Sequence, residues 1–250
     1  MGIFGLEGPV MRFFDKVFNL LWLNILVMIF SLPIVTMGAS FTAMHYVLLR
    51  MAKNEEGYVL PDFWKSFRQN FKQATLIWLP FLFLMTVLGV DAYLFSKGVV
   101  TMPGVYKIVI YFLLFVVAFG TIFVFPVLSH YDNTIKGTVK NAYAMAMFNP
   151  IKSILMLVLY VAPWAAAMFV PNFIFLCLFY GFSLPGFFAA IMYDGIFERF
   201  QVEEAKAKAR ALEEQANDET SDDSNEASLP GESGDVLRRP ALNENEQSEV

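Results

Sequence analysis

Few residues in this chain could carry out nucleophilic, acid–base or metal chemistry. The 250 residues include two histidines, His45 and His130, and a single cysteine, Cys177. A metal centre needs several ligands that converge on one point, and the sequence contains no Cys/His cluster. One cysteine also cannot form an internal disulfide. We therefore expect no metal site and no cofactor, and we expect both histidines to have structural roles.

Motifs typical of enzymes are absent as well. The sequence has no G-x-x-x-x-G-K-[ST], G-x-G-x-x-G, G-x-S-x-G or H-E-x-x-H pattern. Coupled transporters place ionisable groups at mid-membrane, whereas Asp91 and Asp194 fall near the ends of apolar runs. The sequence therefore predicts no catalytic residues and a protein that is not an enzyme.

The chemistry that the sequence does offer is electrostatic, in two segments with the periodicity of amphipathic helices, 62–73 and 132–148. Their cations are Lys65, Arg68 and Lys72 in the first segment and Lys136 and Lys140 in the second. The apolar face of the first segment consists of Phe63, Phe67 and Phe71. We expect both helices to lie in the cytoplasmic interface, with the phenyl rings in the acyl boundary and the cations near anionic headgroups. Such helices can seat a protein on the membrane or dock a cytoplasmic partner, and the residue pattern by itself favours seating.

Long apolar segments must position these residues. Five nearly uncharged runs have about the 20 residues that a helix needs to cross a bilayer. They cover residues 18–37, 74–95, 105–128, 151–170 and 173–193. Because backbone groups in lipid must be satisfied within the segment, these runs should be helices. The fold class predicted is all-α, a polytopic transmembrane bundle with five long membrane helices.

The charges divide the chain into two regions. Residues 203–250 carry 14 acidic and five basic residues, whereas residues 1–202 carry nine acidic and 13 basic ones. We expect a helical membrane domain over 1–200 and a cytoplasmic region over 201–250. In that region the Ala-, Glu- and Lys-rich stretch to residue 215 should extend the last helix, and the polar chain from Ala216 should be a disordered acidic tail.

The distribution of basic residues predicts an orientation. They gather in four bands, before the first apolar run and after the first, third and fifth, while only Lys97 and Lys107 flank the loop between the second and third runs. The positive-inside rule places the four bands in the cytoplasm. Five crossings would nevertheless put the N-terminus outside. Residues 39–51 can resolve the conflict as a short or re-entrant helix that returns to Arg50, which leaves both termini inside; whether this segment spans the membrane stays open.

Several segments resemble the YesL-like family of bacterial membrane proteins. The resemblance rests on the segments 19–22, 32–39 and 63–74, read as NLLW, LPIVTMGA and FWKSFRQNFKQA, and covers about residues 1–195. The motif positions, whose role can be structural only, are Asn19, Trp22, Pro33, Thr36 and Gly38. The molecular activity of this family is undefined. Its members are often encoded beside binding-protein-dependent sugar importers and sensor kinases, so the resemblance implies a bacterial cytoplasmic membrane and an accessory role in carbohydrate uptake.

Two functional hypotheses follow. The first is a non-catalytic accessory of a carbohydrate ABC importer or of its sensor kinase, docking through Lys65, Arg68, Lys72, Lys136 and Lys140. The alternative is a permease that carries a small solute by itself, through a cavity framed by proline-kinked helices. Apart from the lipid bilayer, the expected partners are membrane subunits of an importer or a kinase, and not nucleic acid. The oligomeric state stays open.

Overall fold

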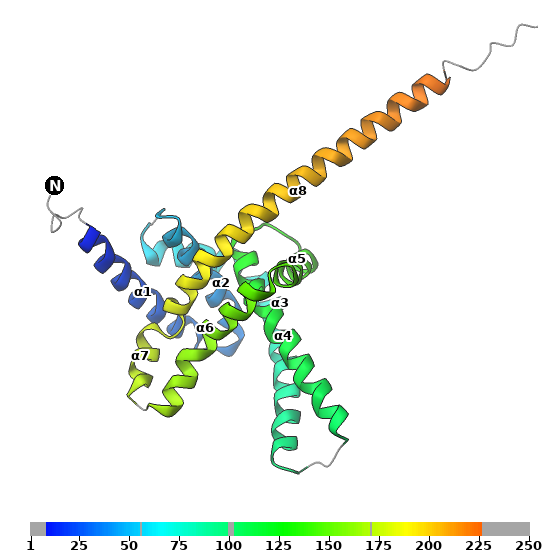
Figure 1. Ribbon diagram of the computed structural model, residues 1–250. Coiled ribbons are helices and arrows are strands. Elements are labelled where there is room, and N and C mark those ends of the chain that lie inside the picture. The colour runs from blue at the N-terminus through cyan, green and yellow to red at the C-terminus, as the bar shows by residue number, and fades with distance from the viewer. Residues whose placement is uncertain (1–8, 56, 100–102, 171, 227–250) are drawn as a thin grey trace, which may run out of the picture. The chain divides into compact units, whose positions relative to one another are not determined.

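The computed structural model describes residues 9–55, 57–99, 103–170 and 172–226. Every regular element in these residues is helical (Figure 1). The elements are α1 (Pro9–Ser31), the 3₁₀ helix η1 (Ile34–Thr36), α2 (Met37–Ala52), α3 (Val59–Ser96), α4 (Gly104–His130), α5 (Ile135–Phe148), α6 (Pro150–Phe169), α7 (Phe173–Tyr180) and α8 (Ser183–Glu226). The predicted all-α class is confirmed.

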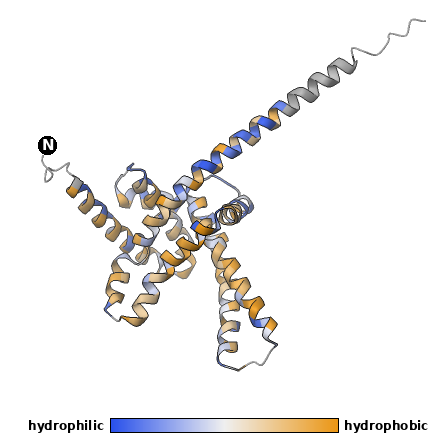
Figure 2. Ribbon diagram, viewed as in Figure 1, coloured by the Kyte–Doolittle hydropathy of each residue, from blue (hydrophilic) through white to orange (hydrophobic). Residues whose placement is uncertain are grey.

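The helices include the membrane spans that the sequence predicted. By length and composition α1, α3, α4 and α6 can each cross a membrane. The pair of α7 and the first part of α8, bent by 55°, meets the same criteria as either a broken fifth span or a re-entrant loop. Figure 2 shows the apolar colouring over the α3–α4 hairpin and α6. The chain is therefore an integral membrane protein with up to five crossings.

The short segment after the first span forms α2, which the rest of the bundle encloses. Most of its side chains are buried, including Met44 and Leu48. Its C-terminal end returns to the N-terminal part of α1, where Lys16 Nζ donates to Asn54 Oδ1 at 2.7 Å. The first membrane helix and α2 therefore form a hairpin, as expected for a segment that brings the chain back.

The segment 62–73 is not a separate interfacial helix, which corrects the sequence prediction. It is continuous with the following apolar run, because α3 extends without interruption over 38 residues, or about 57 Å. Pro80 does not end it. Since no glycine or proline separates the amphipathic part from the apolar run, nothing in the backbone stops the helix there.

The second amphipathic segment is a separate helix, as predicted. α5 begins after Thr134, whose side-chain oxygen accepts a hydrogen bond from the Gly137 amide at 3.2 Å. α5 packs on α4 at Gly120, where an added Cβ would collide with the ring of Tyr143. Burial at this contact raises the pKa of Tyr143.

The last apolar run, expected as one helix over 173–193, is broken at Gly181 and Phe182. Pro185 has no amide hydrogen, so it cannot donate to the carbonyl of Gly181 four residues earlier. The side chain of Asn24 enters the helix ladder at the same point, as described below. A proline and an inserted side chain are both established causes of a sharp bend.

The chain divides into two units, residues 1–201 and 202–250. The second is helical to Glu226 in its described part, with ion pairs between successive turns at Lys206–Glu203 and Lys208–Glu204. The predicted charged helix extension is present. The predicted start of disorder at Ala216 lies inside the helix, and the remainder of that prediction, residues 227–250, lies outside the described residues.

Candidate functional site

The cations of α3 lie on an exposed face, opposite the aromatic residues that hold the helix in the bundle. Phe63 and Phe67 are buried, and their rings lie 5.4 and 5.1 Å from the ring of Phe30 on α1. Lys65, Arg68 and Lys72 are exposed. The expectation that the phenyl stripe inserts into lipid is therefore wrong for Phe63 and Phe67, because α1 covers them.

Two exposed aromatic side chains, Trp64 and Phe71, accompany these cations. The guanidinium of Arg68 lies 5.9 Å from the centre of the Trp64 ring, and Trp64 in turn stacks on Phe67. Trp64 itself is exposed. A cation over an aromatic face is attracted to the ring quadrupole, so the Arg68 side chain is held against the helix rather than extended freely.

The cations of α5 belong to the same part of unit 1. Lys136 and Lys140 are exposed, and Gln73 of α3 donates to the carbonyl oxygen of Asn133 at 2.6 Å, just before α5. This bond ties the end of the basic segment of α3 to the start of α5. We use the name basic surface for the exposed cations Lys65, Arg68, Lys72, Lys136 and Lys140.

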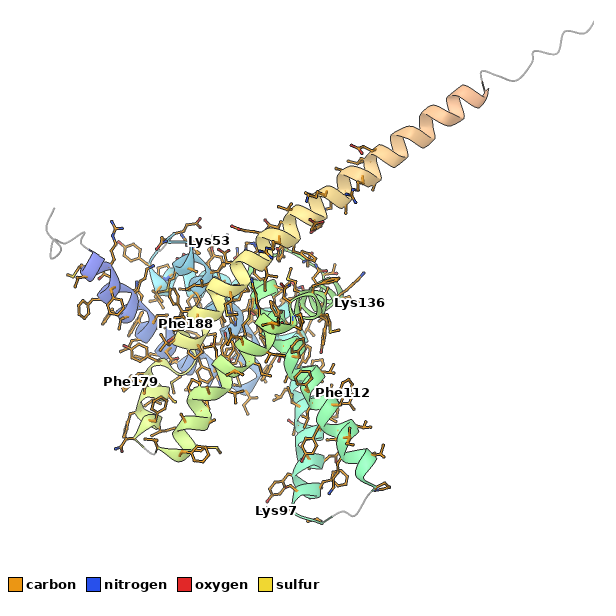
Figure 3. The ribbon with its side chains drawn as sticks, in the orientation of Figure 1. Lys53, Lys97, Phe112, Lys136, Phe179 and Phe188 are labelled. Atoms are coloured by element: carbon orange, nitrogen blue, oxygen red, sulfur yellow. The ribbon has the colours of Figure 1, made fainter. Side chains whose placement is uncertain are left out.

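Ion pairs join the other helix ends in this region. Arg50 Nη1 lies 2.6 Å from Asp62 Oδ2, between α2 and α3. Lys53 Nζ lies 3.1 Å from Asp194 Oδ1, between α2 and α8. Within unit 1 these two ion pairs lie at the helix ends near Lys53, while Lys97 lies at the tip of the α3–α4 hairpin (Figure 3). Charged residues at the two ends of the bundle are what two membrane interfaces require.

Three of the motif positions shape the turn between α1 and α2. Pro33 leads into η1, and the Thr36 hydroxyl donates to the carbonyl of Phe30 at 2.5 Å. Gly38 lies against α3, where an added Cβ would come within 2.6 Å of Trp78 Cβ and 2.8 Å of the Ala74 carbonyl oxygen. These three residues therefore have structural positions in the connection between α1 and α2.

The other two motif positions, Asn19 and Trp22, lie elsewhere. Both line an open groove of about 640 Å³ between α1 and the start of α3. Trp22 is 41% exposed. The motif positions therefore fall into two groups, one that builds the α1–α2 turn and one on an open surface.

Sequence reasoning missed Asn24, which lies in an apolar run and is fully buried. Its Nδ2 donates to the carbonyl of Leu178 at 2.8 Å, and its Oδ1 accepts from the amides of Phe182 and Ser183 at 3.0 and 3.1 Å. In an unbroken helix the Phe182 amide would bond the Leu178 carbonyl. The amide of Asn24 inserts between these two groups and satisfies both. An asparagine inside an apolar run was the available signal.

A second buried polar group surrounds His45. Its ring nitrogens lie 3.3 Å from the hydroxyl of Tyr193 on α8 and 3.5 Å from that of Tyr160 on α6. His45 therefore contacts two side chains inside the bundle, as the expected structural role requires. These contacts join α2, α6 and α8 by polar groups in the bundle interior, where unsatisfied groups are costly.

The remaining candidate residues have structural contacts. The ring of His130 stacks on Phe197 at 5.1 Å, and its Nε2 lies 3.2 Å from Gln201 Nε2. The thiol of Cys177 donates to the carbonyl of Pro163 at 3.2 Å. In the part of the chain that the structure describes, no three His, Cys, Asp or Glu side chains are grouped so that they could hold a metal ion.

Comparison with known proteins gives one family. Residues 17–92 match the family described as protein of unknown function, DUF624. The match begins in α1 and ends in α3, so it includes the α1–α2 turn and the cations of α3. No curated protein and no solved structure matches the chain. The first third of this membrane protein is therefore similar to a family whose activity is undefined.

Proposed function

We propose that the protein is a non-catalytic membrane subunit that associates with a carbohydrate importer or its sensor kinase through the basic surface. The observation that carries this proposal is the separation of roles on α3. Phe63 and Phe67 attach the helix to α1, whereas the three cations stay exposed. With its two buried phenyl rings unavailable to lipid, the segment is less suited to membrane seating and better suited to contact with an acidic partner surface.

The choice of partner rests on the resemblance to YesL-like proteins. The DUF624 match covers Lys65, Arg68 and Lys72 and leaves Lys136 and Lys140 outside. We therefore expect a partner that is common to the family to contact the cations of α3 rather than those of α5. The same resemblance supports a bacterial cytoplasmic membrane, and the positive-inside rule supports a cytoplasmic basic surface with both termini on that side.

Charge reversal tests the docking proposal. We expect Lys65→Glu, Arg68→Glu and Lys72→Glu together to reduce co-purification of importer or kinase subunits from native membranes about tenfold or more, because like charges then face each other. The matched control reverses Lys97 and Lys107, which flank the far tip of the α3–α4 hairpin. Thermal unfolding in detergent checks that the triple variant stays folded. Unchanged recovery of the partner with a folded triple variant would contradict the proposal.

A permease acting by itself is the second candidate, and the broken α7–α8 span is the observation that favours it. Transporters use discontinuous helices whose free backbone groups bind the substrate. Here Asn24 already binds the groups of Leu178, Phe182 and Ser183. The break is therefore better explained by packing, which places the accessory role first. Uptake of a neutral solute by liposomes that contain only this protein, above the uptake by empty liposomes, would reverse this order.

A further inference from the structure

The open groove beside α1 has polar and aromatic walls. Its lining includes Asp15, Phe18, Asn19, Trp22, Tyr58 and Leu60. The first four lie on neighbouring positions of one side of α1, and the last two precede and begin α3. A volume of about 640 Å³ lies in the range of small-molecule binding sites.

The charge of the groove selects the kind of ligand. Asp15 is the one ionisable carboxylate in the described lining, and it forms no hydrogen bond or ion pair with the residues that the structure describes. Three aromatic side chains, Phe18, Trp22 and Tyr58, line the same groove and are exposed. A carboxylate among aromatic rings suits an ammonium group, which is attracted by both.

The position of the groove selects a lipid rather than a soluble amine. Lys16 adjoins Asp15 and bonds Asn54, so the groove opens at the charged end of unit 1, where headgroups lie. From there an exposed apolar stripe follows α1 from Phe14 through Phe18 to Ile29. The stripe extends over about 22 Å at 1.5 Å per residue, which suits an acyl chain lying along the helix.

We propose that this groove binds a phospholipid with an ammonium headgroup, with the ammonium between Asp15 and the Trp22 ring and an acyl chain along α1. Tyr58, in the loop before α3, contributes to the other side of the groove. Asn19 supplies an amide that can donate to the lipid phosphate or ester oxygens. This binding is independent of the basic surface, which attracts negative charge and not an ammonium group.

Native mass spectrometry of the full chain tests the proposal with an equimolar mixture of phosphatidylethanolamine and phosphatidylglycerol. We expect the wild type to retain the ethanolamine lipid preferentially. We expect Asp15→Asn and Trp22→Ala each to lower the ratio of the two bound lipids about threefold or more, because each removes one attraction on the ammonium. The matched controls are Asp91→Asn, a carboxylate outside the groove, and Phe83→Ala, an exposed ring on the α3–α4 hairpin.

Two results would overturn the proposal. One is an equal ratio of bound lipids in the wild type and in folded Asp15→Asn and Trp22→Ala variants. The other is a dimer in the same spectra whose population falls in these variants, since a second copy of the chain would then occupy the groove. Because Asp15 and Trp22 are exposed, we expect their variants to unfold at the same temperature as the wild type, and this measurement accompanies the lipid binding.

Discussion

At the scale of single residues, one buried amide explains the bent last span. Asn24 satisfies three backbone groups at the α7–α8 break, using its donor and its acceptor. A leucine at this position would suit the apolar run equally well by composition. It would leave those backbone groups without partners inside the bundle, which is costly in lipid.

Removal of this buried amide should destabilise the protein. Asn24→Ala should lower the free energy of unfolding by about 1–3 kcal/mol, because the freed carbonyl and amides stay buried. The measurement is the unfolding midpoint of the purified protein in detergent, monitored by the circular dichroism signal of its helices. Asn19→Ala, on the same helix but half-buried in the groove, is the matched control and should change the midpoint little. Equal losses for the two variants would mean that the bonds of Asn24 do not support the break.

At the scale of elements, α2 is the helix around which unit 1 is packed. Its side chains are mostly buried, its N-terminal glycine touches α3, and its C-terminal end carries the ion pairs to α3 and α8. His45 adds polar contacts to α6 and α8. α2 has 16 residues, fewer than the ~20 that a membrane-crossing helix needs. Contacts with neighbouring helices on several sides hold it in place.

A glycine pair tests how closely α2 and α3 approach. Gly38→Ala should destabilise the bundle by about 1–3 kcal/mol, because the new methyl group would meet Trp78 and the backbone of Ala74. Gly89→Ala, inside α3 with open space around it, should be neutral or stabilising by up to about 1 kcal/mol, because alanine favours helix. Unfolding midpoints measured in the same detergent compare the two. The same sign of change at both positions would contradict the close packing.

At the scale of the whole membrane protein, the ends of the helices define two sides. Lys16, Asn54 and Asp62 lie together at one end, through the contacts of α1, α2 and α3. The tip of the α3–α4 hairpin is the other end, near Lys97. Because α2 returns to the start of α1, we expect the N-terminus and the start of α3 to lie on the same side of the membrane.

Cysteine labelling tests this topology. In a Cys177→Ala background we expect Arg12→Cys and Lys136→Cys to react with a membrane-impermeant maleimide from the same side, and Lys97→Cys from the opposite side. All three native side chains are exposed, and Cys177 is buried. Labelling of whole cells and of inverted vesicles distinguishes the sides. Reaction of Arg12→Cys from the side of Lys97→Cys would mean that α2 does not bring the chain back.

The candidate site could be predicted in part. The spacing of Lys65, Arg68 and Lys72 places them on one helical face, and the structure leaves that face exposed. The same spacing groups Phe63 and Phe67 on one face. From the sequence we expected lipid around these two rings, whereas in the structure α1 covers them. Periodicity tells which residues share a face, but it does not say whether lipid or another helix covers that face.

The sequence alone determined that this is an all-α membrane protein, because about 20 apolar residues in lipid have few alternatives to a helix. It also located the returning segment and the second amphipathic helix. Three features could be seen only in the three-dimensional structure. Segment 62–73 continues into the membrane span, the side chain of Asn24 inserts at the break between α7 and α8, and Asp15 and Trp22 line one groove. These features depend on contacts between distant segments, and composition and local spacing carry no information about which distant side chain fills a given position.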